Sequence, residues 1–125
     1  MKKVLARAER EQLKGVIADR LVDLRLDLVA AYVFGSFVTD DAFSDIDLGI
    51  LLSDKPGRPL ILELDLESEL EDIAPCPVDV RVLNGGPLSF VQNVIRTGEV
   101  IADRDPNRRA DYEGWVMKKY FDFAP

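Results

Sequence analysis

The chain contains no histidine, and it has one cysteine and one tryptophan among its 125 residues. The lack of histidine excludes a Ser–His catalytic pair and a histidine-bound zinc ion, and a single cysteine excludes a disulfide scaffold. No apolar run approaches the roughly 18 residues of a membrane span. The N-terminus carries two lysines directly after Met1, as a secretory signal peptide can, but Arg7 and Glu9 lie where the apolar segment of such a signal would be. We therefore expect a cytoplasmic protein with no membrane attachment, in which Cys76 is a reduced thiol.

Positive charge is scarce in the middle of the chain. Residues 31–80 carry two basic and twelve acidic side chains, a balance of −10, whereas residues 1–30 balance at +2 and residues 81–125 at +1. The net charge of −7 therefore comes from the middle segment. Direct binding to DNA is not expected, because the phosphate backbone requires clustered positive charge. An acidic concentration of this kind indicates either a solvated face or a site for a divalent cation.

The length and the composition, 47% hydrophobic and 31% charged, predict one soluble globular domain over residues 1–125. We predict three parts within this domain: an N-terminal helix at residues 1–28, the core at residues 29–104, and a last helix and tail at residues 105–125. The first helix rests on an apolar stripe whose members recur at steps of three and four: Leu13, Ile17, Leu21, Leu24 and Leu28.

Four short apolar runs bounded by turn residues predict the strands of the core. They are residues 29–34, 45–52 and 78–83, together with an edge strand at 99–103. Pro87 and Gly98 bracket a helix at residues 88–97, and Asp105 followed by Pro106 opens the last helix.

Residues 60–73 fit two patterns, because their leucines alternate as in a strand and also step as in a helix. The glutamate and leucine content favours the helix. The resulting order of elements predicts an α/β or α+β domain, in which helices pack a small mixed sheet.

Three aspartates interrupt these strands, although aspartate is disfavoured in sheets. Asp45 and Asp47 share one face of the second strand, with Cα atoms roughly 6.5–7 Å apart. Asp79 lies on the polar face of the third strand and completes a triad if the two strands are neighbours. Grouped carboxylates repel one another unless a cation lies between them, and magnesium prefers such oxygen ligands. The arrangement suits phosphoryl or nucleotidyl transfer, where two carboxylates hold metal on a triphosphate and the third takes a proton.

Gly35 and Ser36 follow the first strand directly. Glycine lets the backbone approach a ligand closely, and the serine hydroxyl with the N–H groups after it can bind phosphate. Taken singly, each motif has a common structural explanation, a turn for Gly-Ser and a solvent-facing strand for Asp-x-Asp. Their joint occurrence in this order is much harder to obtain by chance.

Together these motifs resemble the nucleotidyltransferase superfamily that includes DNA polymerase beta, and more closely the minimal nucleotidyltransferases (MNT) of the MntA type. The matching segments are Val33-Phe34-Gly35-Ser36, Ser44-Asp45-Ile46-Asp47-Leu48 and Val78-Asp79-Val80. The likeness continues through residues 83–84, 94–101, 104–106 and the tail from residue 112, so the resemblance spans roughly residues 30–125, nearly the whole domain.

The resemblance implies a polymerase beta-like fold that uses Mg²⁺ and transfers a nucleoside monophosphate, AMP from ATP, to an acceptor. Gly35 and Ser36 would hold the triphosphate of ATP or another NTP. Asp45 and Asp47 would bind magnesium, and Asp79 would bind a second metal or take the proton of the nucleophile. MntA-type members are antitoxins that add AMP to a tyrosine of a HEPN toxin, a helical RNase. The resemblance therefore implies a HEPN-type toxin as partner.

Residues 37–44 depart from the family, because this loop is short and contains no arginine or lysine. Without an arginine or lysine in this loop, the triphosphate has one nearby cation fewer. This favours an alternative, a non-catalytic binding module that neutralises its partner by contact. A phosphoacceptor receiver domain fits less well, since its acids belong at strand ends. Arg81 shares strand parity with Asp79, but we interpret it as a solvated strand residue. The sequence leaves the acceptor, the nucleotide preference and a homo-oligomer open.

Overall fold

The computed structural model describes residues 2–123. Eleven helices and strands follow one another along this part of the chain: β1 (Lys3–Val4), α1 (Arg7–Leu24), β2 (Leu28–Phe34), α2 (Ser36–Thr39), β3 (Ala42–Phe43), β4 (Ile46–Leu52), α3 (Pro59–Glu71), β5 (Val78–Val82), α4 (Leu88–Thr97), β6 (Glu99–Asp103) and α5 (Pro106–Phe123). The predicted fold class, helices around a small mixed sheet, is confirmed.

The main sheet has the strand order β5-β4-β2-β6, and β1 pairs separately with β3. β2 is antiparallel to β4 and to β6, whereas β4 and β5 are parallel. A parallel pair needs a crossover, which α3 provides. β2 is central and covered on both faces, which explains its nearly uninterrupted apolar sequence.

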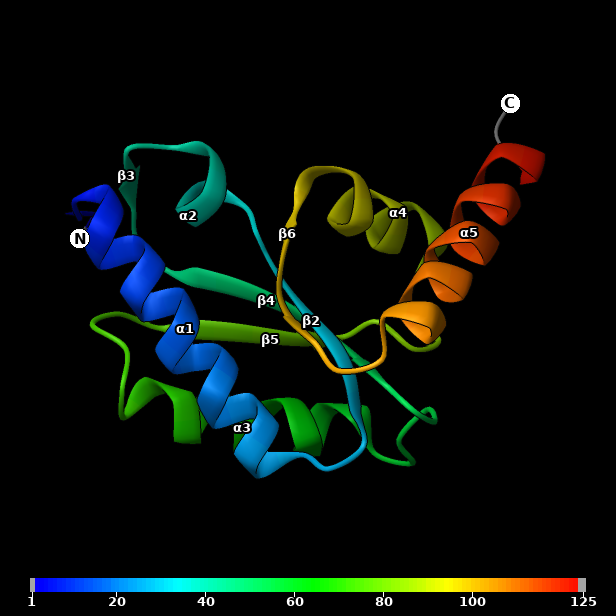
Figure 1. The fold of residues 1–125 in the computed structure, drawn as a ribbon, viewed down its shortest axis with the longest axis horizontal. Coiled ribbons are helices and arrows are strands. Elements are labelled where there is room, and N and C mark those ends of the chain that lie inside the picture. The colour runs from blue at the N-terminus through cyan, green and yellow to red at the C-terminus, as the bar shows by residue number, and fades with distance from the viewer. Residues whose placement is uncertain (1, 124–125) are drawn as a thin grey trace.

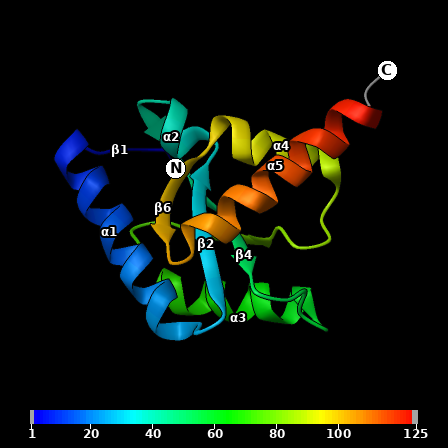
Figure 2. The ribbon, with the colours of Figure 1, turned by 45° about the vertical axis from the view of Figure 1, so that its right-hand side comes forward.

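Helices α1 and α3 cover one face of the sheet, and α4 and α5 cover the other (Figure 1 and Figure 2). On the first face Leu21 of α1 and Leu70 of α3 are fully buried. On the second face Val94 of α4 and Val116 of α5 are buried with Tyr32 of β2. Burying an aliphatic side chain of this size stabilises the fold by roughly 1.5–3 kcal/mol, so both layers contribute to one domain.

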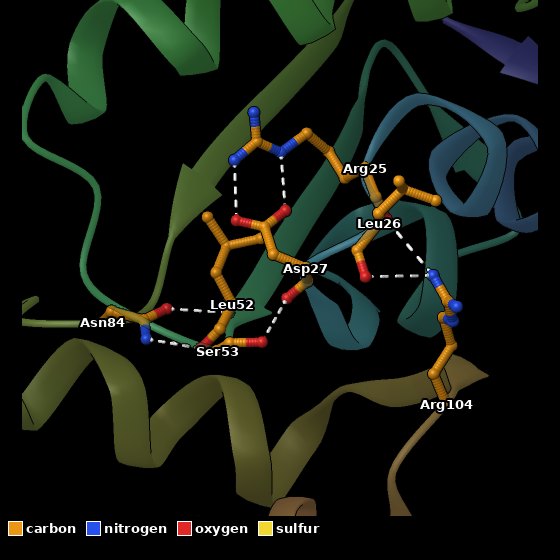
Figure 3. Close-up of polar contacts among 7 residues, drawn as sticks. All are labelled: Arg25, Leu26, Asp27, Leu52, Ser53, Asn84 and Arg104. Atoms are coloured by element: carbon orange, nitrogen blue, oxygen red, sulfur yellow. Dashed lines mark hydrogen bonds and ion pairs between the residues drawn. The ribbon is translucent and has the colours of Figure 1, made fainter.

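The first helix ends earlier than its apolar stripe suggests. α1 stops at Leu24, and Leu28 belongs to β2, so the prediction that Leu28 continues the helix is wrong. The chain turns at residues 25–27, where the backbone of Arg25 is extended and its guanidinium pairs with both carboxylate oxygens of Asp27, at 2.7 and 2.9 Å (Figure 3). The N–H of Leu28 then donates to the carbonyl of Arg25 at 3.3 Å.

The remaining elements agree with the sequence to within a residue or two. The ambiguous segment forms the helix α3, and α4 and β6 have the expected bounds. Asp105 caps α5 by accepting a hydrogen bond from the N–H of Arg108 at 3.1 Å. β1, α2 and β3 were not predicted, because two to four residues are too few for a periodic signal. The end of the predicted tail, residues 124–125, lies outside the described residues.

Among residues 2–123, none of the helices combines the length and the apolar character needed to cross a bilayer.

Candidate active site

Strand pairing brings two of the predicted aspartates to the same level of the sheet. Asp47 on β4 and Asp79 on β5 are register partners in a parallel pair, which confirms that these strands are neighbours. Neighbouring strands lie about 4.8 Å apart, so the two side chains leave the sheet side by side. Asp45 directly precedes β4. All three aspartates are half-buried.

The three carboxylates influence one another electrostatically. The pKa of Asp47 is raised to about 6, first by burial and then by the charges of Asp45 and Asp79. Arg81 opposes it. Like charges disfavour the ionised form of a neighbour, so Asp47 responds to the proximity of both other aspartates. A cation at this position would relieve the repulsion and favour the ionised form.

Gly35 lies against the central aspartate. Its φ of +76° is a conformation that side chains disfavour, and a Cβ built on it would be 2.5 Å from Oδ2 of Asp47. Phe34, the preceding residue, is the register partner of Asp47 in β2. Ser36 begins the short helix α2. The structure therefore places the Gly-Ser turn beside Asp47, as the sequence order suggested.

A cavity of about 650 Å³ opens beside these acids. Asp47 and Asp79 line it, whereas Gly35, Ser36 and Asp45 lie outside its lining. Phe34 and Phe90 form an aromatic wall, with their rings edge to face and 5.6 Å between centroids. A mostly apolar cleft with a few convergent charges is the usual form of a small-molecule site.

Asn84 lines the cavity and is held in place by two hydrogen bonds to Leu52, which Figure 3 shows. Its side-chain amide accepts the N–H of Leu52 at 2.9 Å and donates to the carbonyl of Leu52 at 2.8 Å. This reciprocal pair copies the hydrogen bonding of a strand neighbour beyond the end of β5. Ser53, the next residue, donates from its N–H at 2.8 Å and its hydroxyl at 3.1 Å to the carbonyl of Asp27. The end of β4 is thereby tied to the turn before β2.

Two cations border the cavity, Lys55 after β4 and Arg81 on β5. Nε of Arg81 lies 3.4 Å from Oδ1 of Asp79. Arg81 is exposed, as interpreted from the sequence, but it also reaches the acids. The side chain of Lys55 lies over Gly85, which has a φ of +74° and would place a Cβ 2.8 Å from Cε of Lys55.

The donor set suits a hard cation, since it consists of carboxylate oxygens. Within residues 2–123, however, no three Cys, Asp or Glu side chains come close enough together to hold a metal by themselves. The predicted triad is therefore not assembled as a complete ligand group. Magnesium does not need one, because it is usually held by one or two carboxylates together with phosphates and water.

Sequence reasoning missed three contributors to the cavity: Lys55, Asn84 and the Phe34–Phe90 wall. Lys55 lies in a Pro- and Gly-rich turn and Asn84 in a loop, where polar residues are common and carry no specific signal. Phe34 belongs to the matching segment before Gly35, but an aromatic residue at a strand end is first interpreted as core.

The profile of the family described as "Polymerase beta, Nucleotidyltransferase" matches residues 12–107. Three solved structures share the fold. A chain of the MntA–HepT toxin–antitoxin structure has 20% identity and a TM-score of 0.74, over 90% of this chain and 87% of that chain. A chain from the complex of tri-AMPylated Shewanella oneidensis HEPN toxin with MNT antitoxin has 21% identity and a TM-score of 0.76, over 90% and 87%.

A chain of a toxin–antitoxin structure with AMP-PNP has 22% identity and a TM-score of 0.75, over 87% of each chain. Curated protein sequences yield no significant match. The family profile covers more than half of the chain, including the Gly-Ser turn and all three aspartates. This chain is therefore a member of the polymerase beta nucleotidyltransferase family.

Proposed function

We propose that this protein transfers AMP from ATP to a tyrosine of a HEPN-type toxin, in the presence of Mg²⁺, and so acts as an antitoxin. The observation that carries the proposal is the register of Asp47 with Asp79, beside the Gly35 turn and at the mouth of a nucleotide-sized cavity. Two relatives in fold point to the same chemistry: one is a complex with an AMPylated HEPN toxin, and another contains AMP-PNP.

Gly35 and Ser36 bind the triphosphate in this proposal, through backbone N–H groups and the serine hydroxyl. Asp45 and Asp47 hold the magnesium ion, which when bound neutralises charge on the triphosphate. Lys55 and Arg81 supply the positive charge that the loop after Ser36 lacks. The aromatic wall of Phe34 and Phe90 offers a surface for the base or ribose.

Asp79 acts as the general base in the transfer. The tyrosine hydroxyl oxygen forms a bond to the α-phosphorus of ATP, while the bond from that phosphorus to the bridging oxygen of pyrophosphate breaks. The hydroxyl proton passes to the carboxylate of Asp79, and pyrophosphate leaves. Arg81 must release Asp79 for this step, because an ion pair stabilises the negative charge of the carboxylate and weakens it as a base.

The test is transfer of label from ATP to a HEPN-type toxin, in magnesium buffer. We expect label on the toxin with the wild-type protein and none with Asp45→Asn or Asp47→Asn, which remove charge with little change of volume. Asp65→Asn, at an exposed residue of α3, is the matched control and should transfer as wild type. Absence of label with every nucleotide and metal tried would reject the enzymatic function.

A second candidate is an antitoxin that neutralises the toxin by contact alone. The loop at residues 37–44 favours it, because Asp40 and Asp41 are present there and no cation is. In this case Asp45→Asn and Asp47→Asn would still rescue cells that express the toxin. Rescue that requires these aspartates would reject the contact-only function.

A further inference from the structure

β5 is an edge strand of the main sheet, with β4 on one side only. The outward N–H groups of an edge strand lack strand partners, and proteins must satisfy or shield them. Here the outward groups belong to Val78, Val80 and Val82, whose side chains are buried on the α1–α3 face. Asp79 and Arg81 alternate with them and extend to the opposite face.

Three glutamates of α3 accept these N–H groups, and we call them the glutamate ladder (Glu63, Glu67 and Glu71). Glu71 accepts from Val78 at 3.0 Å, Glu67 from Val80 at 2.8 Å, and Glu63 from Val82 at 2.8 Å. All three bonds use Oε2. α3 runs alongside β5 in the opposite direction (Figure 1).

The spacing explains how a helix can serve a strand in this way. Four residues of α-helix rise about 6 Å. Two residues of strand rise about 6.6 Å. The spacing of glutamates at every fourth residue of α3 therefore nearly equals the spacing of every second residue of β5, and the match lasts for three hydrogen bonds. Each bond has a charged acceptor, which makes it stronger than a bond to a backbone carbonyl.

Asp79 lies between the two N–H groups that Glu71 and Glu67 hold. Burial raises the pKa of Glu67 above its ordinary value; the N–H of Val80 opposes this rise, and the nearby carboxyl group of Asp79 adds to it. The backbone on both sides of Asp79 is thus anchored to α3, and its side chain is kept opposite Asp47.

We propose that Glu67 and Glu71 are positioning residues for Asp79, holding its backbone so that the carboxylate stays in register with Asp47. This inference rests on the proposed function for its catalytic part, since Asp79 is the base there. The edge pairing itself does not depend on any activity. One measurement therefore tests the pairing of α3 with the edge of β5, and a second tests the positioning of Asp79 for catalysis.

The first measurement is amide hydrogen exchange by NMR on the free protein. We expect Glu67→Met to remove the protection of the Val80 amide, because methionine fills similar space but offers no strong acceptor. Glu67→Gln keeps an acceptor oxygen and should retain the protection. Glu69→Met is the matched control, because Glu69 is an exposed glutamate of the same helix that does not belong to the glutamate ladder. Its contact is an ion pair with Arg20 at 3.7 Å. Unchanged protection of Val80 in Glu67→Met would overturn the ladder.

The second measurement is the steady-state rate of AMP transfer. Displacing a reacting group by about 1 Å can cost on the order of a hundredfold in rate. We expect Glu67→Met to lower kcat by about tenfold to a hundredfold with the KM for ATP little changed, and Glu67→Gln to restore most of kcat. A kcat equal to wild type in a variant that has lost Val80 protection would overturn the positioning role.

A wild-type protein that protects Val80 but transfers nothing would refute the proposed function and the catalytic part of this inference, while the edge pairing would stand. A fall of kcat in Glu69→Met equal to that in Glu67→Met would also overturn the positioning role, because the loss would then follow from any change on α3.

Discussion

Gly35 and Asp47 are in such close approach that a Cβ on Gly35 would be 2.5 Å from the carboxylate oxygen of Asp47. This contact joins the turn after β2 to the acids of β4, two segments that are separated by α2 and β3. It also identifies a position where one methyl group should disturb both the site and the backbone of the turn.

Gly35→Ala should impair AMP transfer more than tenfold, because the added methyl group displaces Asp47 and the φ of +76° disfavours a side chain. The strained backbone alone, with φ +76° and ψ −156° in a region that is essentially restricted to glycine, should cost about 1–3 kcal/mol of stability. Gly15→Ala is the control: apart from the backbone of α1 itself, nothing lies within 4 Å of the methyl group that alanine would add. Alanine there should stabilise the helix by about 0.5–1 kcal/mol. Thermal unfolding and the transfer assay check both, and full activity in Gly35→Ala would contradict the contact.

The raised pKa of Asp47 predicts a specific dependence of stability on pH. Between the ordinary value of 3.8 and the folded value of about 6, the folded state binds more protons than the unfolded state. The free energy of unfolding contributed by this group therefore falls as pH rises through this window. The side chain of Asp47→Asn cannot ionise, so the variant should not lose stability as the pH rises through this window. It should therefore be more stable than wild type above pH 6 without divalent cations.

Chemical denaturation from pH 4 to 8 in a chelating buffer measures this difference. Asp65→Asn should run parallel to wild type across the range, since Asp65 is exposed on α3. A wild-type protein more stable than Asp47→Asn at pH 7 would show that the carboxylate is stabilised in the fold and not repelled by its neighbours.

Arg10 of α1 should control the order of the loop after Ser36. Its Nη1 donates to the carbonyl of Phe37 at 2.6 Å, Nη2 donates to that of Asp41, and the guanidinium lies 4.9 Å from the ring centroid of Phe43. Loss of these contacts in Arg10→Met should cost about 1–3 kcal/mol and speed amide exchange across α2. Because this loop follows the proposed phosphate-binding turn, ATP binding should weaken as well.

Exchange rates at α2 and calorimetric binding of ATP test this expectation. Arg7→Met is the matched control, because Arg7 is an exposed residue of the same helix. Arg10→Lys keeps the charge but not the planar fork, so it should restore only part of the effect. Equal exchange rates in Arg10→Met and wild type would show that the loop holds its shape without the arginine.

Tyr32→Phe should destabilise the packing of α5 on the sheet. Tyr32 is buried, and its hydroxyl donates to Oε2 of Glu113 at 2.7 Å, while Arg109 donates to Oε1 at 2.9 Å. A hydrogen bond to a charged group contributes about 1.5–3 kcal/mol, so we expect a loss of that size. Tyr112→Phe, which removes a 3.2 Å bond to the carbonyl of Leu83, should cost less, about 0.5–1.5 kcal/mol. Urea denaturation ranks the two, and the reverse order would contradict the network.

Most of the fold follows from local patterns of the chain. Apolar runs and turn residues located β2, β4, β5 and β6, and capping residues located α4 and α5, because these signals act over a few neighbouring residues. Leu28 shows where such patterns fail: its spacing matches the stripe of α1, but the chain turns before it and Leu28 pairs with Leu52 of β4 in the sheet. The elements β1 and β3 exist because they pair with each other across 38 residues, which no local pattern reports.

The proposed chemistry of the site was predicted from residue types in order, since Gly35, Ser36, Asp45, Asp47 and Asp79 combine in few other contexts. The placement of Gly35 beside Asp47 depended on the antiparallel register of β2 with β4, and the placement of Asp79 beside Asp47 depended on the parallel register of β4 with β5. The same holds for the glutamate ladder, whose helix and strand are each periodic but whose alignment arises only when α3 packs along β5. Periodicity is a property of one segment, whereas register and approach are properties of two, and only packing of the whole chain sets them.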